Sequence, residues 1–253
     1  IQPEKLRGSE ELQQIINLGA DIVITAAFGQ ILPKELLEAP RLGCINVHAS
    51  LLPKYRGGAP IHQAIIDGQA TTGVTIMYMA EKLDAGDIIS QREITIEDTD
   101  HTGSMFDKLS EVGRELLKDT LPSIIEGTNA RIPQDESQVT YASNIGREQE
   151  RIDWHKDART IYNQVRGLHP WPVAYTTFEG ANFKIWWAQV GQTSNNREPG
   201  EVAAIHKDYF EIATGEGGTL AVFDLQPSGK KRMTAEEYLR GTGSKLQIGE
   251  RFE

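Results

Sequence analysis

Three polar side chains in the first half of the chain have the types and spacing needed for proton transfer and for stabilising a negative charge. Asn46 and His48 lie two residues apart around a short buried strand, predicted at 44–47, so an extended backbone puts both side chains on one face. A histidine can exchange a proton near neutral pH, and an uncharged amide can donate to a developing oxyanion. Asp84 follows the next predicted strand, and it can approach His48 if the two strands are neighbours. This set suits acyl transfer to an amine.

A structural interpretation of the same residues stays open at this point. An Asn-x-His at the end of a strand also occurs without any chemical role. Asp84 and Asp87 flank a glycine, so either could cap a turn. Arg56, in the Gly-rich loop that follows the strand, could contact a phosphate or hold the loop in place.

Strands and helices alternate through the first half of the chain, which places these side chains in an α/β fold. The near-continuous apolar run at 21–27 is typical of a parallel strand that is covered on both faces. Further strands are predicted at 44–47, 73–79 and 88–96, and helices at 9–19, 34–38, 60–67 and 102–126. The alternation predicts a Rossmann-like, mostly parallel sheet, in a catalytic domain that spans residues 1–133.

The second half of the chain has a different pattern. Residues 134–150 are polar and lack periodicity, which predicts a linker. A helix at 156–167 then precedes short strands at 173–178, 183–190, 200–205, 209–213 and 219–225, separated by turns. Thr234 and Glu237 fit a capping box, which predicts one more helix. The pattern indicates a small antiparallel, OB-like barrel in a second domain, residues 151–253.

Composition excludes several classes of protein. The net charge of -10 excludes a generally basic nucleic-acid-binding surface, although Lys230, Lys231 and Arg232 form one dense basic cluster. The single cysteine, Cys44, cannot form an intrachain disulfide, and this is expected in a reducing compartment such as the cytoplasm. No apolar run approaches the roughly 18–20 residues of a membrane span, so no membrane association is predicted.

A set of motifs, in matching order and spacing, resembles the 10-formyltetrahydrofolate-dependent formyltransferases. The matching motifs are Asn46-Val-His48-Ala-Ser50-Leu-Leu-Pro53, Tyr55-Arg-Gly-Gly-Ala-Pro60, Gly73-Val-Thr-Ile-Met77 and Leu83-Asp-Ala-Gly-Asp87. Further motifs are similar to the methionyl-tRNA branch of this family. They are Ala26-Ala-Phe-Gly-Gln-Ile-Leu-Pro33, Ile152-Asp-Trp154, Val165-Arg-Gly-Leu168, Pro170-Trp-Pro172 and Gly229-Lys-Lys-Arg-Met233. The resemblance covers essentially the whole chain, including the second domain.

The resemblance implies a reaction, a donor and a set of site residues. The formyl group of 10-formyltetrahydrofolate would move to the α-amino group of methionine on initiator tRNA. Asn46 and His48 would stabilise the oxyanion, and Asp84 would support His48 and help to remove the amine's proton. The folate site would be lined by Ser50, Leu51, Leu52 and Pro53. No metal is implied, and we expect a monomer.

Two alternatives to this function follow from the same motifs. One is a formyltransferase for another amine, such as an amino sugar nucleotide or glycinamide ribonucleotide. The other is an inactive folate- or RNA-binding fragment. The second is motivated by the opening Ile1-Gln2-Pro3, because we expect that the chain lacks the family's N-terminal segment of strand, helix and second strand.

Overall fold

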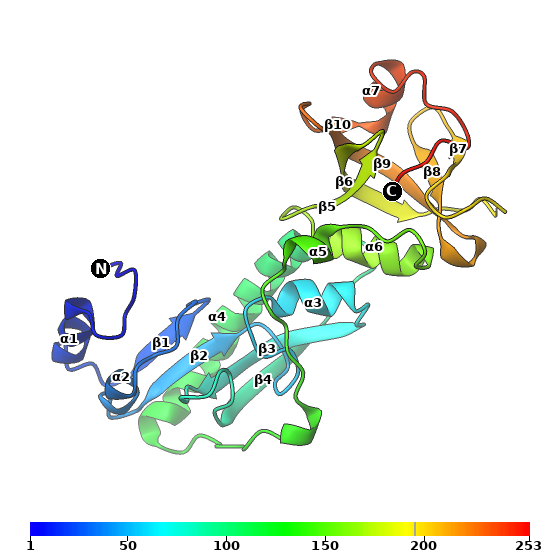
Figure 1. Cartoon of the computed structure of the whole chain (residues 1–253). Coiled ribbons are helices and arrows are strands. Elements are labelled where there is room, and N and C mark those ends of the chain that lie inside the picture. Colours follow the sequence, from blue (N-terminus) through cyan, green and yellow to red (C-terminus); the bar gives the residue numbers. More distant parts are fainter. Residues whose placement is uncertain (195) are drawn as a thin grey trace. The chain divides into compact units, whose positions relative to one another are not determined.

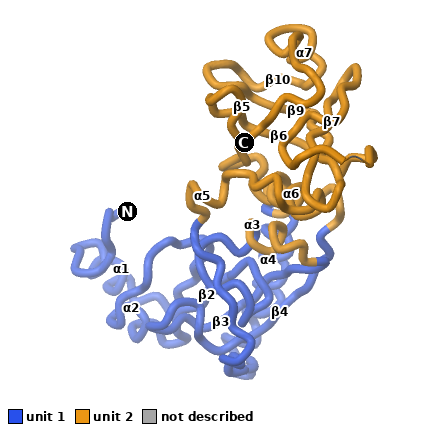
Figure 2. The backbone as a smooth tube through the Cα atoms, turned by 45° about the vertical axis from the view of Figure 1, so that its right-hand side comes forward, with its two compact units in different colours: residues 1–61, 70–96, 106–144 blue, residues 62–69, 97–105, 145–253 orange. Residues whose placement is uncertain are grey.

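Two separate sheets organise the chain, in a computed structural model that describes residues 1–194 and 196–253. Each sheet lies in its own compact unit (Figures 1 and 2). Unit 1 contains residues 1–61, 70–96 and 106–144, and unit 2 contains residues 62–69, 97–105 and 145–253. The polar segment 134–150, predicted to be a linker, is therefore divided between the two units.

The sheet of unit 1 has four strands in the order β1 (Val23–Ala26), β2 (Cys44–His48), β3 (Thr71–Tyr78) and β4 (Ile88–Thr95). Only β1 and β2 run parallel; β2 pairs with β3, and β3 with β4, in antiparallel fashion. The sheet is therefore mixed, and the prediction of a mostly parallel sheet is wrong for these strands.

The path of the connection between β2 and β3 explains this difference. Helix α3 (Pro60–Ile66) has seven residues, so it is only ~10 Å long. The chain re-enters the sheet close to where it left, because His48 at the end of β2 pairs with Thr75 of β3. Residues 79–87 then connect β3 to β4 as a hairpin. The alternation of strands and helices in the sequence shows that a helix lies between β2 and β3. It does not show whether this helix returns the chain to the other end of the sheet, which a parallel strand requires.

Helix α4 (Thr102–Glu126) covers one face of this sheet and leaves the other face for Asn46 and His48. Figure 1 shows the helix running behind the strands. A Cβ added at Gly113 would lie 3.0 Å from Val47 Cγ1, so the helix backbone approaches β2 closely there. Val47 alternates with Asn46 and His48 along β2, so these two polar side chains point to the opposite face.

An apolar cluster packs at the β1 side of the sheet. It joins α1 (Glu10–Asn17), α2 (Lys34–Glu38) and the start of β2 through buried Leu6, Leu12, Leu32, Leu36 and Cys44. Helix α1 begins at the predicted cap, because Ser9 Oγ accepts a hydrogen bond from the backbone N–H of Leu12 at 3.1 Å.

The Cys44 thiol is expected to make stability fall at alkaline pH. It is 3% exposed and donates to the carbonyl of Leu36, and its burial raises the pKa of Cys44 to about 11. An unfolded thiol has a pKa near 8.5, so the folded chain holds this proton more tightly. The stabilisation is complete below about pH 8.5 and is lost as pH rises toward 11. Urea unfolding of the wild type should show a steeper loss over this range than Cys44→Ser, and equal slopes would contradict the expectation.

Unit 2 is built on an antiparallel sheet of six strands. The order is β5 (Ala174–Phe178), β6 (Ala181–Val190), β9 (Thr219–Pro227), β8 (Phe210–Ala213) and β7 (Val202–Ile205), with β10 (Met233–Thr234) paired to β9. Helices α5 (Arg147–Glu150), α6 (Ala158–Gly167) and α7 (Ala235–Arg240) accompany it. Helix α7 begins at the predicted capping box of Thr234 and Glu237.

The predicted OB-like barrel is not confirmed. Among the described residues, the edge strands β5 and β7 do not pair with each other, so the sheet stays open. The C-terminal residues lie at these edges and make single bridges, from Phe252 to Phe178 and from Arg251 to Glu201. A few bridges of this kind do not replace a continuous strand pairing.

None of the described helices is long and apolar enough to cross a membrane.

Candidate active site

His48 and Asp84 face each other at the end of β2. Strands β2 and β3 are neighbours, as the sequence argument required, and the loop after β3 brings Asp84 back toward His48. His48 Nδ1 lies 3.7 Å from Asp84 Oδ2, and the two side chains are only 6% and 12% exposed. This distance is too long for a hydrogen bond, but it places a carboxylate beside an imidazole in a site that is largely shielded from water.

The other nitrogen of the His48 ring fixes the tautomer. Nε2 lies 3.0 Å from the carbonyl oxygen of Tyr55. A carbonyl only accepts hydrogen bonds, so Nε2 carries the proton and donates it. Nδ1, which faces Asp84, is then the position through which the ring can gain or lose a proton.

Asp84 is held by the loop that follows β2. Its Oδ2 accepts a hydrogen bond from the backbone N–H of Gly57 at 2.8 Å. Gly57 has φ of +119°, and a Cβ added there would lie 2.6 Å from the carbonyl oxygen of Ala142. Glycine is therefore required at the point where this backbone donates to the carboxylate.

Asn46 lies on the same face of β2 as His48 and is half-buried. Thr25 of the parallel neighbour β1 donates its hydroxyl to Asn46 Oδ1 at 2.9 Å. Because this bond occupies the amide oxygen, the amide hydrogens on Nδ2 remain the groups that can donate to a substrate. Of the predicted catalytic residues, the structure therefore places His48 and Asp84 next to each other and Asn46 on the same face of β2 as His48.

The four residues predicted to line a folate site have different surroundings. Ser50 is fully buried and donates its hydroxyl to the carbonyl of Lys54 at 2.7 Å. Leu52 is 3% exposed and belongs to an apolar cluster with Met77. Leu51 and Pro53 are half-buried. Their side chains, unlike those of Ser50 and Leu52, keep surface that a ligand could contact.

Arg56 holds the loop, which decides between its two interpretations. The side chain is fully buried, and Nε and Nη2 donate to Gln134 Oε1 at 3.0 and 2.8 Å. Nη2 also donates to Glu136 Oε1 at 2.9 Å. Hydrogen bonds from Lys82, and then from Arg56, hold the pKa of the Glu136 carboxyl below its usual range. Gln134 and Glu136 lie in a segment with no periodicity, so sequence patterns did not point to them.

An apolar cavity of about 310 Å³ lies at the β1 side of the site. Thr25, which orients Asn46, is one of its lining residues, with Val23, Phe28, Leu32 and Leu36 among the others. Phe28 is 45% exposed and the neighbouring Ile31 is 54% exposed. The cavity therefore offers apolar surface next to the strand that carries Asn46.

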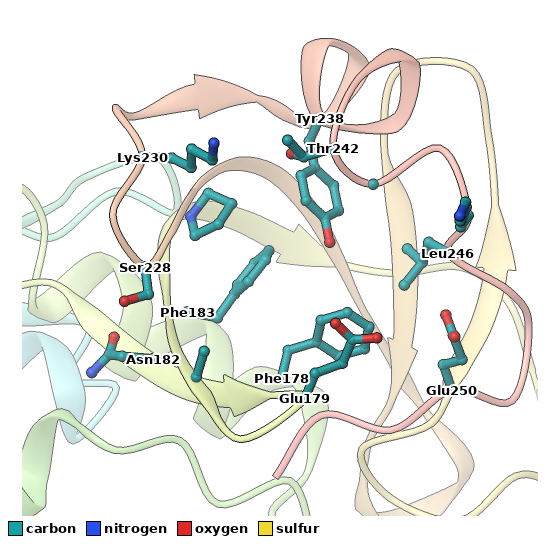
Figure 3. Close-up of a pocket in the computed structure, with 14 residues that line it drawn as sticks. Phe178, Glu179, Asn182, Phe183, Ser228, Lys230, Tyr238, Thr242, Leu246 and Glu250 are labelled. Carbon is teal, nitrogen blue, oxygen red and sulfur yellow. The ribbon is translucent and has the colours of Figure 1, made fainter.

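A second cavity, of about 290 Å³, lies in unit 2, and the sequence argument did not find it. Figure 3 shows Lys230 and Ser228 along one side and Tyr238 with Thr242 on the other, with Phe183 between them. Lys230 belongs to the predicted basic cluster. Burial, assisted by Glu179 and Glu250, raises the pKa of Tyr238 to about 12, so its phenol stays neutral.

Among the described residues, no cluster of three or more His, Cys, Asp or Glu could hold a metal.

The chain is similar to known formyltransferases along most of its length. Residues 1–121 match the family described as Formyl transferase, and residues 144–243 match Formyl transferase, C-terminal domain. A methionyl-tRNA formyltransferase from Lysinibacillus sphaericus is 78% identical over the whole chain, which covers 81% of that relative. One from Halalkalibacterium halodurans is 58% identical over 98% of this chain and 78% of its own length.

Solved structures show the same fold. HypX from Aquifex aeolicus, in complex with tetrahydrofolic acid, has a TM-score of 0.67 at 21% identity, over 87% of this chain and 38% of HypX. A 4-N formyltransferase from Francisella tularensis has a TM-score of 0.59 at 25% identity, over 68% of this chain and 71% of that one. With both halves of the sequence matched and about four fifths of the length of the curated relatives covered, the chain belongs to the methionyl-tRNA formyltransferase family.

Proposed function

We propose that this chain transfers a formyl group from 10-formyltetrahydrofolate to the α-amino group of methionyl initiator tRNA. The observation that carries the proposal is the largely buried His48–Asp84 pair, with Asn46 on the same face of the sheet. The donor supplies a formyl carbon bound to N10. In the reaction a bond forms between the amine nitrogen and this carbon, the bond to N10 breaks, and one proton moves from the amine to N10.

Asp84 and His48 are suited to handle this proton. The amine must lose a proton as it attacks, and the Asp84 carboxylate can accept it directly or through a water molecule. His48 Nδ1 faces the same carboxylate, so the proton can be shared by the pair before it reaches the leaving nitrogen. The Tyr55 carbonyl fixes the ring for this task by holding Nε2.

Asn46 is suited to stabilise the tetrahedral oxyanion. Its amide oxygen is occupied by Thr25, which directs the Nδ2 hydrogens to the substrate side. The oxyanion role predicted for His48 stays a prediction. Nε2 donates to the Tyr55 carbonyl, and this hydrogen bond would have to break before Nε2 could donate to the oxyanion. The amide of Asn46 needs no such exchange.

The surroundings of Asn46 fit a folate as donor. The apolar cavity of about 310 Å³ beside β1 offers space for a flat ring, and exposed Phe28 and Ile31 offer apolar contact. We place the folate between this cavity and the loop that carries Leu51 and Pro53. Ser50 and Leu52 contribute to this site by shaping the loop, because their side chains are buried inside it.

For tRNA, we propose Lys230 and Lys231 as phosphate contacts in unit 2. Both side chains are exposed. Arg232, the third member of the cluster, pairs with Asp224 and lies 4.5 Å from the centre of the Trp186 ring, so its charge is already compensated. Phosphate contacts from lysines position a nucleic acid without reading its bases.

A comparison of acceptor substrates tests the proposed function. The chain is incubated with 10-formyltetrahydrofolate and, in separate reactions, methionyl initiator tRNA, an amino sugar nucleotide or glycinamide ribonucleotide. We expect formylmethionyl-tRNA as the main product. Formylation of a nucleotide substrate in preference to tRNA would favour the other formyltransferases. Binding of donor and tRNA without any product would favour an inactive binding module.

We further propose that the chain works as a monomer in the cytoplasm. The single, buried Cys44 suits a reducing compartment. Light scattering during gel filtration would test the monomer, and a dimer mass would contradict it.

A further inference from the structure

We propose that Gln134, in the segment 134–144, is a positioning residue for the His48–Asp84 pair. The inference rests on the formyl transfer proposed above. Its evidence is a set of hydrogen bonds that join this segment to the two loops around the pair. All the groups involved lie in unit 1.

The Gln134 side chain links the two loops. Its Nε2 donates to the carbonyls of Asp84 and Gly86 at 2.7 and 2.8 Å. Its Oε1 accepts both hydrogen bonds from Arg56 described above. An amide has two N–H hydrogens and one oxygen with two lone pairs, so every hydrogen-bonding position of Gln134 is used. A side chain that is saturated in this way has little freedom to move without breaking a contact.

The Asp84 loop needs support from outside. Asp84 has φ of +48°, a left-handed conformation that few residues other than glycine adopt. At Gly86 a Cβ would lie 1.8 Å from the carbonyl oxygen of Tyr78, so the turn is also tightly packed against β3. An unfavourable backbone conformation persists where its surroundings fix it. The two hydrogen bonds from Gln134 reach the carbonyls of this turn.

Arg56 connects Gln134 to the other side of the pair. The residue before it, Tyr55, provides the carbonyl that accepts from His48. The residue after it, Gly57, provides the N–H that donates to Asp84. A shift of the buried Arg56 would therefore move both backbone groups that contact the pair.

The backbone of the segment fixes the same loop. The N–H of Arg56 donates to the carbonyl of Thr140 at 2.9 Å, and the N–H of Ala142 donates to the carbonyl of Arg56 at 2.7 Å. Ala59 also donates to Ala142, at 3.1 Å. The segment thus pairs with residues 56–59 in a defined register, while Gln134 reaches the Asp84 loop from the same segment.

Gln134→Ala tests the proposal, with Gln138→Ala as a matched control. Gln138 lies in the same segment but is exposed, and its side chain donates to Asp135. We expect Gln134→Ala to lower kcat by about 10- to 100-fold, because small displacements of catalytic groups have effects of this size. KM for both substrates should stay within about threefold, as for a loss confined to the transition state. Gln138→Ala should keep wild-type kcat and KM.

A spectroscopic readout separates this proposal from the proposed function. The ring ¹⁵N shifts of His48 report which nitrogen carries the proton. We expect one tautomer, with the proton on Nε2, in the wild type and in Gln138→Ala. A mixture of tautomers is expected in Gln134→Ala. An unchanged His48 spectrum together with unchanged kcat in Gln134→Ala would overturn the positioning role, whereas formylation by the wild type would still support the function. If the wild type formylates no tRNA, the spectrum alone decides the positioning role.

Gln134→Glu provides a second test that can be used if Gln134→Ala fails to fold. Glutamate keeps an acceptor for Arg56 but loses both N–H donors to the Asp84 loop. We expect kcat to stay reduced and the spectrum of His48 to stay mixed. Wild-type values in Gln134→Glu would overturn the link through the Asp84 carbonyl.

Discussion

Asp84→Asn is expected to lower kcat by about 10²- to 10⁴-fold, the range that general acid–base catalysis contributes. Asparagine has the same shape, and its Oδ1 can still accept from the N–H of Gly57, so the loop should keep its structure. The amide cannot take up a proton from the attacking amine. Single-turnover formylation of methionyl initiator tRNA measures the loss.

Asp87→Asn is the matched control, because it changes another carboxylate of the same loop. Asp87 pairs with Arg131, and its side chain is 34% exposed. We expect its turnover to stay within about threefold of wild type, since exposed pairs contribute little. Turnover of Asp84→Asn close to that of Asp87→Asn would exclude Asp84 as the proton acceptor.

Asn46→Ala is the second variant with a large expected effect. Loss of one oxyanion donor raises the barrier by ~2.7–4 kcal/mol, which lowers turnover by about 10²- to 10³-fold. Folate binding should change little, because the ground-state carbonyl gains less from this donor than the oxyanion does. Quench-flow kinetics and equilibrium binding of the donor, measured on the same variant, separate the two effects.

Two further variants show whether the effect is specific to Asn46. Asn129→Ala removes another half-buried asparagine of unit 1, whose amide donates to Tyr78 and Ala130, and it should keep wild-type turnover. Thr25→Val removes the hydroxyl that orients Asn46, and a smaller loss of about 10-fold is expected, as for a neutral hydrogen bond. Wild-type turnover in Asn46→Ala would rule out its role as oxyanion donor.

The sequence predicts which polar side chains come close together better than it predicts the direction of the strands that carry them. Asn46 and His48 share a face because alternation along a strand is a local property of the backbone. The sequence places Asp84 near His48 on the condition that their strands are neighbours. Strands β2 and β3 do pair, and Asp84 Oδ2 lies 3.7 Å from His48 Nδ1. The direction of β3 is not a local property, because it depends on the path that the chain takes through a short helix.

Gln134 and Glu136 illustrate what local patterns cannot show. Their partners lie far away in sequence: Arg56 is 78 residues from Gln134 and 80 residues from Glu136. A segment ordered by side-chain hydrogen bonds to distant loops needs no apolar period, so it resembles a linker in the sequence. Similarly, the open sheet of unit 2 depends on which edge strands meet, and a series of short strands does not specify that.

The pairing of residues 140–142 with the loop after β2 also affects where the chain can be truncated in experiments on the isolated catalytic unit. A fragment that stops after Pro133 would keep Asn46, His48 and Asp84, but it would lose the amide that spans the two loops. A fragment that stops after Asn144 would keep it. If the shorter fragment were inactive, the cause could be the loss of Gln134. The result would therefore not show whether tRNA recognition by unit 2 is needed for formyl transfer.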